Sequence, residues 1–332
     1  MEPDPTSVAT GIAWVVFGGA IVPAQDARVS VLAESFLYGE TLFETMRAQR
    51  GAPVWFQEHW DRLSSSAAKL EFSLPDASVV EVSIRELLCR CGLKEARVRL
   101  TLTRDAMPGW IVTAVPLVPP SGSSPCERGV KVVGWTPDAA PWGGSGIVAK
   151  SGAWMALASA RRRAARAGAW DALRTDPAGR ILEGTASNVF WIRHGVLETP
   201  ALALGVLPGI IRAKLLAHAA DWGLEAREVE EPIRLAEGDG GESFHLPKGV
   251  AEAAFRLPER DAEGTIRLPA GEGNRSIRLA EVDEVLLTNS LWDVVPVVQC
   301  DELAIGGGRV GPWAERLRAE MLDLSLRSGT RM

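Results

Sequence analysis

The stretch DALRTDPAGRILEGTASNVFWI, residues 171–192, decides the fold class of this 332-residue chain. Two runs rich in Leu, Ile, Val and Phe flank the turn-forming residues DPAG, which predicts a strand, a turn and a second strand. Upstream, VKVVGW at residues 130–135 predicts another strand, and the alanine-rich residues 151–167 predict a long helix. Strands and helices that follow one another in this way indicate a mixed α/β domain.

The first third of the chain predicts a second, smaller α/β unit. Between residues 11 and 31 the apolar runs IAWVVF, AIV and VSVL are broken by Gly, Pro and Asp, which predicts short strands joined by turns. Residues 59–70 and 79–91 have the apolar spacing of two helices packed on that sheet. The stretch RVRLTLTR at 97–104 alternates strictly and predicts a half-buried strand. Its apolar face carries Val98, Leu100 and Leu102, and its polar face carries Arg97, Arg99, Thr101 and Thr103.

Length and linker composition predict two domains. The segment PPSGSSP at 119–125 has the composition of a linker. We place an N-terminal domain at 1–120, a linker at 121–126 and a larger domain at 127–332. Residues 238–276, rich in Gly, Glu, Asp and Arg, have the composition of an insertion in the larger domain. That domain also contains PGIIRAKLLAHAADWG, which predicts a helix after a glycine-containing turn, and it ends in a predicted helix near 313–326.

The composition excludes several classes of function. The net charge is −6 and the pI is about 5.5, so the overall field does not attract nucleic acid or an anionic membrane. The longest apolar stretch is too short to span a bilayer, and the first residues lack the basic start of a signal peptide. The four cysteines form no CxxC pair and the four histidines show no metal-ligand spacing. We therefore expect a cytoplasmic protein without a metal site.

The sequence gives little support to three further kinds of function: a serine hydrolase, a phosphate-loop nucleotide binder and a nucleic-acid-binding protein. No GxSxG motif supports a serine hydrolase. GSGIVAKS at 144–151 approaches the phosphate loop GxxxxGK[ST], but Ala149 replaces the glycine that lets backbone N–H groups wrap a phosphate. The basic run Arg161, Arg162, Arg163 and Arg166 favours a solvated helix face over a nucleic-acid patch, because alanines fill the gaps.

Four ordered segments carry a more specific signal. They are FLYGETLFETMRAQRGAPVWFQEHWDRLSSSAAKL (36–70), AKSGAWMALASARRRAARAGAWDAL (149–173), GRILEGTASNVFWIRHGVLETPAL (179–202), and GVLPGIIR (205–212) with the later VLLTNSLWDVVPV (285–297). In this order they resemble the class IV aminotransferases, a family that includes branched-chain and D-amino-acid aminotransferases and aminodeoxychorismate lyase. The resemblance implies a small N-terminal α/β sandwich, a larger barrel-like C-terminal α/β domain, a homodimer, and pyridoxal 5'-phosphate as the cofactor.

The resemblance assigns cofactor-binding roles to seven residues. Lys150 falls on the catalytic lysine, whose amine condenses with the cofactor's aldehyde. Glu183 falls on the carboxylate that keeps the pyridine nitrogen protonated. The phosphate suits a helix N-terminus and a guanidinium. These groups are expected from the N–H groups of Ile210 and Ile211 and from Arg62, with Asn289 and Ser290 closing the other side. Many relatives have Thr where Ile211 stands, so one hydroxyl contact is missing.

The expected substrate side differs more from the family pattern. Tyr38, the single tyrosine, stands where relatives often have a substrate-facing aromatic residue. Arg99 and Arg104 are the candidates for the substrate carboxylate. Glu40, Thr41, Ala153 and Trp154 depart from the usual residues of the pocket wall.

The function implied is transamination between a small amino acid and a 2-oxo acid. The alternative within the family is 4-amino-4-deoxychorismate lyase, which forms 4-aminobenzoate and pyruvate. A non-catalytic family member or a phosphate-loop nucleotide binder are further alternatives.

Overall fold

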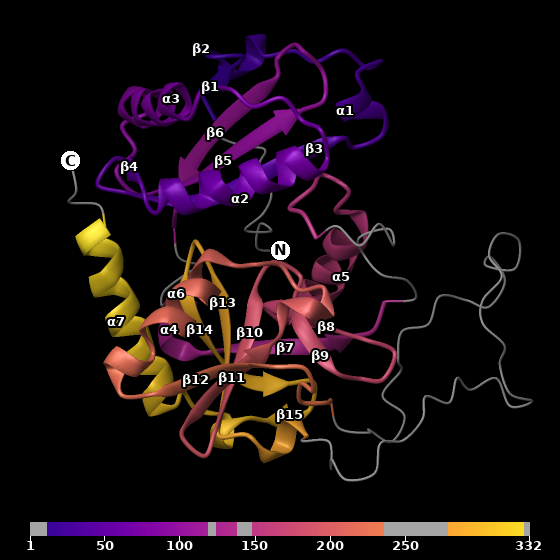
Figure 1. The fold of residues 1–332 in the computed structure, drawn as a ribbon, viewed down its shortest axis with the longest axis vertical. Helices are drawn as coiled ribbons and strands as arrows, with labels where there is room; N and C mark the ends of the chain where they lie inside the picture. Colours follow the sequence, from indigo (N-terminus) through magenta and orange to yellow (C-terminus); the bar gives the residue numbers. More distant parts are fainter. Residues whose placement is uncertain (1–11, 119–123, 138–147, 236–277, 329–332) are drawn as a thin grey trace, which may run out of the picture.

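The computed structural model describes residues 12–118, 124–137, 148–235 and 278–328 (Figure 1). They form two α/β units, one on each side of a deep cavity. The first sheet ends at Pro116 and the second begins at Val130. Half of the predicted linker, residues 121–123, and the whole of the predicted 238–276 insertion lie outside the described residues. Of the linker, Ser124 caps a short helix, α4 (Pro125–Arg128).

The N-terminal unit is a six-stranded antiparallel sheet with two helices on one face. Its strands, in spatial order, are β2 (Ala20–Pro23), β1 (Trp14–Phe17), β6 (Trp110–Pro116), β5 (Ala96–Thr103), β3 (Thr41–Gln49) and β4 (Ala52–Pro53). Helices α2 (Phe56–Lys69) and α3 (Ala77–Arg90) pack against it, as predicted (Figure 1). The predicted strand VSVL is wrong. The chain leaves the sheet after β2 through a 3-10 turn at Ala24–Asp26 and reaches a short helix, α1 (Glu34–Leu37).

Because side chains alternate along each strand, one face of this sheet packs in the core and the other face lines the cavity. On β5, Val98, Leu100 and Leu102 are buried in the core beneath α2 and α3. The opposite face carries Arg97 and Arg99 toward the second unit, where both line the cavity. The alternating pattern read from the sequence is therefore confirmed, and its cationic side faces the site.

The C-terminal unit contains a closed ring of six strands. These are β10 (Asn188–Arg193), β13 (Glu284–Asn289), β14 (Asp293–Cys300), β7 (Val130–Trp135), β8 (Asp171–Thr175) and β9 (Ile181–Gly184), and β9 pairs back onto β10. Strands β11 (Val196–Pro200), β12 (Glu225–Val229) and β15 (Leu303–Ala304) extend it. Helices α5 (Met155–Arg166), α6 (Ile210–His218) and α7 (Pro312–Ser328) surround this barrel (Figure 1). None of the described helices is long and apolar enough to cross a bilayer.

The decisive stretch 171–192 contains three strands where the sequence predicted two. The second apolar run folds back on itself at a tight turn, in which the Gly184 N–H donates to the Ser187 carbonyl oxygen at 2.8 Å. Asp171 holds this turn by accepting hydrogen bonds from the Thr185 N–H at 3.1 Å and the Ser187 hydroxyl at 2.9 Å. The result is a hairpin that presents Glu183 on one strand opposite Asn188 on the other.

The predicted helix over 151–167 begins four residues late, at Met155. Ser151 pairs with Leu42 of β3, and the Gly152 N–H donates to the Thr41 carbonyl oxygen at 2.8 Å. A Cβ on Gly152 would lie 2.1 Å from the Thr41 hydroxyl oxygen, so only glycine allows this approach. Because the backbone groups of Ser151 and Gly152 pair with β3, these two residues do not form the first turn of the helix. The segment after Lys150 therefore links the two units.

A buried ion pair also joins the units. Arg47 of β3 donates through Nη1 to Asp293 Oδ2 of β14 at 2.8 Å, and both side chains are almost fully buried. This contact lies beside the turn that carries Asn289 and Ser290.

Candidate active site

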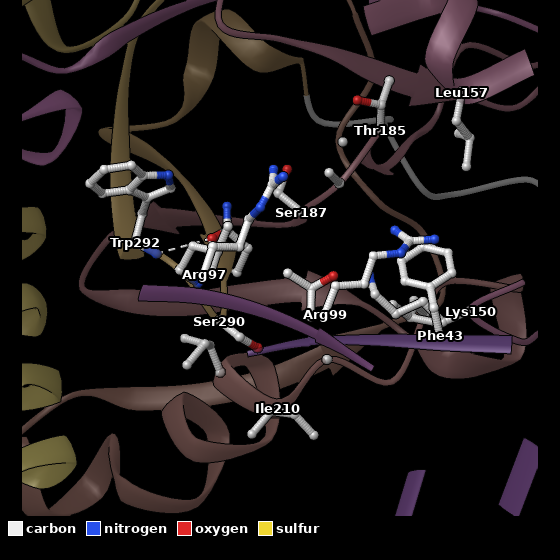
Figure 2. Close-up of a pocket in the computed structure, with 18 of the residues that line it drawn as sticks. Phe43, Arg97, Arg99, Lys150, Leu157, Thr185, Ser187, Ile210, Ser290 and Trp292 are labelled. Atoms are coloured by element: carbon white, nitrogen blue, oxygen red, sulfur yellow. Dashed lines mark hydrogen bonds between the residues drawn. The ribbon is translucent and has the colours of Figure 1, made fainter. Parts of the chain in front are cut away.

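A cavity of about 520 Å³ lies between the open face of the first sheet and the barrel (Figure 2). Its lining includes all seven residues that the sequence assigned to the cofactor: Arg62, Lys150, Glu183, Ile210, Ile211, Asn289 and Ser290. They come from separate segments of the chain. The barrel and the antiparallel sheet together bring them to one place.

Lys150 is partly buried at the junction of the two units. Its carbonyl oxygen accepts from the Phe43 N–H at 2.8 Å, which fixes its backbone to β3. Its Nζ lies 4.9 Å from the centroid of the Phe43 ring. Burial lowers the pKa of Lys150 to about 8, and the charge of Arg62 acts in the same direction while Glu44 opposes it. Near neutral pH a larger fraction of this amine is therefore neutral and nucleophilic than for an exposed lysine.

Glu183 is a buried carboxylate that lines the same cavity. Arg174 Nη2 donates to its Oε1 at 3.0 Å, and the Leu207 N–H donates to its Oε2 at 2.9 Å. Burial raises the pKa of Glu183, while Arg174, the Leu207 N–H and Lys150 oppose that rise. A carboxylate in this environment favours a cationic group beside it in the cavity.

The N-terminus of α6 forms an anion site together with Arg62. Gly209, the residue before the helix, offers no side-chain cap, so the first N–H groups of α6 have no capping partner. A Cβ on Gly209 would lie 1.9 Å from Asn188 Oδ1, which explains the need for glycine. Arg62 Nη1 donates to the Pro208 carbonyl oxygen at 3.0 Å, which places the guanidinium at the start of the helix. A phosphate suits this combination of N–H groups and positive charge.

The turn between β13 and β14 closes the other side of the anion site. Asn289 Oδ1 accepts from the N–H groups of Leu291 and Trp292, both at 3.0 Å. The Asn289 side chain thus shapes the turn that presents Ser290 to the cavity (Figure 2). Thr288 also lines the cavity, and its buried hydroxyl has no hydrogen-bond partner among the described residues. Such an orphaned group is consistent with a polar ligand at this place.

Arg99 is the candidate substrate residue that the structure places in the cavity. Its guanidinium lies 3.6 Å from the centroid of the Phe43 ring, and its Nε donates to the Thr101 hydroxyl at 3.3 Å. Figure 2 shows it beside Lys150, while Arg97 lies toward Trp292. Burial, together with the charge of Arg97, lowers the pKa of Arg99 to about 10. Both effects disfavour the charged form of the Arg99 guanidinium. An anion bound beside Arg99 would therefore stabilise that charged form.

Two other substrate candidates lie elsewhere. Arg104 donates to Glu40 Oε2 at 2.9 Å and to the carbonyl oxygens of Leu70 and Glu71 at 2.9 and 2.6 Å, so it caps the end of α2. It does not line the cavity. The side chain of this strand-end residue turns toward α2 instead. Tyr38 is 71% exposed and does not line the cavity of its own chain.

The sequence interpretation missed several residues of the site. Glu44 and His59 stand in the quoted segment 36–70 but received no role there. Arg174 could have been noticed in the sequence, because it is a charged residue inside the otherwise apolar run of strand β8. In the structure Arg174 is only 5% exposed. Arg161, assigned to a solvated face, lines the cavity. A phosphate loop leads directly into a helix at its lysine, whereas α5 begins five residues after Lys150, which argues against the phosphate-loop hypothesis.

Comparison with known proteins identifies the family. The model of class IV aminotransferases matches residues 41–241. A putative branched-chain-amino-acid aminotransferase of Methanocaldococcus jannaschii is 26% identical over 96% of this chain and 98% of its own length. A probable branched-chain-amino-acid aminotransferase of Rickettsia typhi is 31% identical and covers 68% of this chain and 80% of its own.

Solved structures agree. The branched-chain amino acid aminotransferase of Thermoproteus uzoniensis with norvaline has the same fold, with a TM-score of 0.71 at 20% identity over 97% of this chain and 97% of that one. A putative 4-amino-4-deoxychorismate lyase from Legionella pneumophila shares it too, with a TM-score of 0.65 at 21% identity over 90% and 95% of the two chains. A further branched-chain amino acid aminotransferase, solved with pyridoxamine 5'-phosphate, superimposes with a TM-score of 0.73 at 26% identity, over 97% of this chain and 96% of that one. The chain belongs to the class IV aminotransferases, a family of pyridoxal-phosphate-dependent enzymes.

The cavity fits the family's cofactor. It offers a lysine with a lowered pKa, a carboxylate that favours a cationic partner, and an anion site at a helix N-terminus. These are the groups that an aldehyde, a pyridine nitrogen and a phosphate require.

Proposed function

We propose that this protein transfers an amino group between a small amino acid and a 2-oxo acid, with Lys150 as the catalytic residue. The observation that carries the proposal is the place of Lys150. Its amine has a lowered pKa, and it lines the same cavity as the carboxylate of Glu183, the guanidinium of Arg62 and the start of α6. A simple ligand-binding protein has no need for such an amine.

The cofactor, when bound, supplies an aldehyde that receives the amino group and a ring that withdraws electrons from the substrate α-carbon. Lys150 Nζ would hold the cofactor's aldehyde carbon, and as a free amine it would move the proton at the substrate α-carbon. Glu183 holds the proton on the pyridine nitrogen, and Arg174 and the Leu207 N–H hold Glu183 in place. The N–H groups of Ile210 and Ile211, with Arg62 and Ser290, bind the phosphate.

Arg99 is proposed to bind the substrate carboxylate. It comes from the first unit and faces the cavity next to Lys150 (Figure 2). The apolar side chains Ile111, Val115 and Leu157 on the lining fit an aliphatic substrate side chain. The names of the relatives, branched-chain-amino-acid aminotransferases, agree with such a substrate.

A homodimer is proposed from an exposed apolar patch. The patch consists of Val31, Leu32, Phe36, Leu37, Tyr38 and Met155, each at least half exposed. These residues lie just before and in α1 and at the start of α5, two elements on the same side of the molecule (Figure 1). Several large apolar side chains exposed on one side favour an interface there. Tyr38 lies in the patch, where it can serve the partner's cavity. We also retain the proposal of a cytoplasmic enzyme, consistent with four free cysteines.

The reaction type is tested by incubating the cofactor-loaded protein with single amino acids in the absence of a 2-oxo acid. We expect one conversion per active site to the pyridoxamine form, followed by full recovery when a 2-oxo acid is added. An aminodeoxychorismate lyase would instead release pyruvate and 4-aminobenzoate from aminodeoxychorismate and turn over without an acceptor. The fold shared with the Legionella protein makes this the second candidate.

The Arg99→Ala variant is expected to raise the KM for the amino acid about tenfold to a hundredfold, because a charge-assisted hydrogen bond to the carboxylate is lost. The rate with the corresponding amine, which has no carboxylate, should not fall. Steady-state kinetics with both substrates measure this. Arg104→Ala is the matched control, since Arg104 serves the end of α2. An unchanged KM in Arg99→Ala would remove Arg99 from the substrate site.

A further inference from the structure

Glu44 occupies an unusual place for a carboxylate. It lies in the middle of β3, between Phe43 and Thr45, which both line the cavity. Alternation along the strand puts it on the opposite face with Leu42 and Met46, which belong to the apolar core under α2 and α3. Glu44 is only 1% exposed. A buried charge on this face lowers the stability of the fold unless it is paired with an opposite charge and hydrogen-bonded.

Two residues of α2, one turn apart, engage this carboxylate. Arg62 donates to both oxygens, from Nε to Oε1 at 2.7 Å and from Nη2 to Oε2 at 2.6 Å. His59 Nδ1 lies 2.7 Å from Oε2, and His59 is also completely buried. Burial alone would raise the pKa of Glu44, but Arg62 and His59 outweigh it and hold the pKa well below its usual range. The group is therefore a permanent carboxylate.

The contacts of Arg62 determine which of its donors remain. A guanidinium has five N–H donors. Glu44 accepts two of them, on Nε and Nη2, and the Pro208 carbonyl oxygen accepts a third, on Nη1. Among the described residues no acceptor is found for one N–H on each terminal nitrogen, and Nη1 lies at the N-terminus of α6. Two donors on one planar group match two oxygens of a phosphate.

We propose that Glu44 is a positioning residue for the cofactor phosphate. Its carboxylate holds the guanidinium of Arg62 by one edge, so that the remaining N–H groups point into the anion site with the N–H groups of α6. His59 holds the carboxylate in turn. Glu44 itself does not line the cavity and acts only through Arg62. This inference rests on the proposed cofactor site.

The Glu44→Gln variant tests the proposal, because the amide has nearly the same shape but presents a donor where Arg62 needs an acceptor. Dissociation constants are measured by fluorescence titration of the apoprotein with pyridoxal 5'-phosphate and with pyridoxal, which lacks the phosphate. We expect the constant for pyridoxal 5'-phosphate to rise about tenfold to a hundredfold and that for pyridoxal to stay unchanged. Both aldehydes bond to the same lysine. Any effect of Glu44 on Lys150 therefore changes both dissociation constants equally and cancels in the ratio of the two constants.

Glu198→Gln is the matched control. Glu198 is also a buried glutamate paired with an arginine, Arg227, but it lies on β11 and does not line the cavity. It should leave the ratio of the two constants unchanged. If Glu44→Gln does not fold, Glu44→Asp keeps the charge on a shorter arm and should raise the ratio by a smaller factor.

The outcomes separate this inference from the proposed function. A parent protein that binds both aldehydes, with the ratio unchanged in Glu44→Gln or Glu44→Asp, overturns the role of Glu44 alone. An equal loss for both aldehydes also overturns it, since that result indicates a general effect on the fold. A parent protein that binds neither aldehyde contradicts the proposed function and this inference together.

Discussion

Replacement of Lys150 by alanine is expected to lower kcat for transamination by about 10⁴-fold, the upper range for loss of a positioned proton-transfer group. The site offers no substitute, because Lys150 is the lysine that lines the cavity within the described residues. The measurement is the rate of a single half-reaction with an amino acid in the loaded protein. The Lys150→Ala protein should retain its fold, since the side chain makes no ion pair with another described residue.

Lys69→Ala serves as the matched control for this result, because Lys69 ends α2 as an exposed side chain. Its half-reaction rate should equal that of the parent. Added methylamine should restore part of the rate in Lys150→Ala, since a small amine can occupy the vacated space and move the proton. A Lys150→Ala protein with the parent's rate would show that another group does this work.

Replacement of Glu183 by glutamine is expected to lower the half-reaction rate by about one to three orders of magnitude. A neighbouring carboxylate raises the pKa of a cationic group by about one to three units, so its loss lowers the protonated fraction of the ring nitrogen accordingly. The effect should shrink as the pH falls, because acid protonates the ring without help. Stopped-flow measurements across a pH series detect both features.

The control for Glu183 is again Glu198→Gln, which removes a buried charge that does not line the cavity. A pH-independent loss in Glu183→Gln would indicate that the residue shapes the pocket and does not act through its charge. An unchanged rate would remove Glu183 from the proton-holding role altogether.

The sequence predicted the elements whose periodicity is strong. The alternation of β5 and the apolar spacing of α2 and α3 are confirmed, because each element buries one face against a continuous core. The four motifs also predicted the cavity-lining residues around the cofactor. Because the order of the motifs indicates the position of each in the fold, it predicted that Lys150 and Glu183 line one cavity, although a lone lysine or glutamate carries no such signal.

Long-range contacts account for what the sequence did not predict. The helix after Lys150 begins late because residues 151 and 152 pair with β3, a strand far earlier in the chain. Arg104 turns away from the cavity because the free carbonyl groups at the end of α2 accept its donors. Glu44 could not be assigned from the sequence, since a charge in an apolar strand is explained only when His59 and Arg62 are seen beside it.

The central claim, that Lys150 carries the cofactor, is tested most directly by chemical fixation. The protein is loaded with pyridoxal 5'-phosphate, reduced with sodium borohydride to make the lysine bond permanent, digested, and analysed by peptide mass spectrometry. The account predicts one phosphopyridoxyl group per chain, on the peptide that contains Lys150. A label on another lysine of the chain, or no label at all, would contradict it.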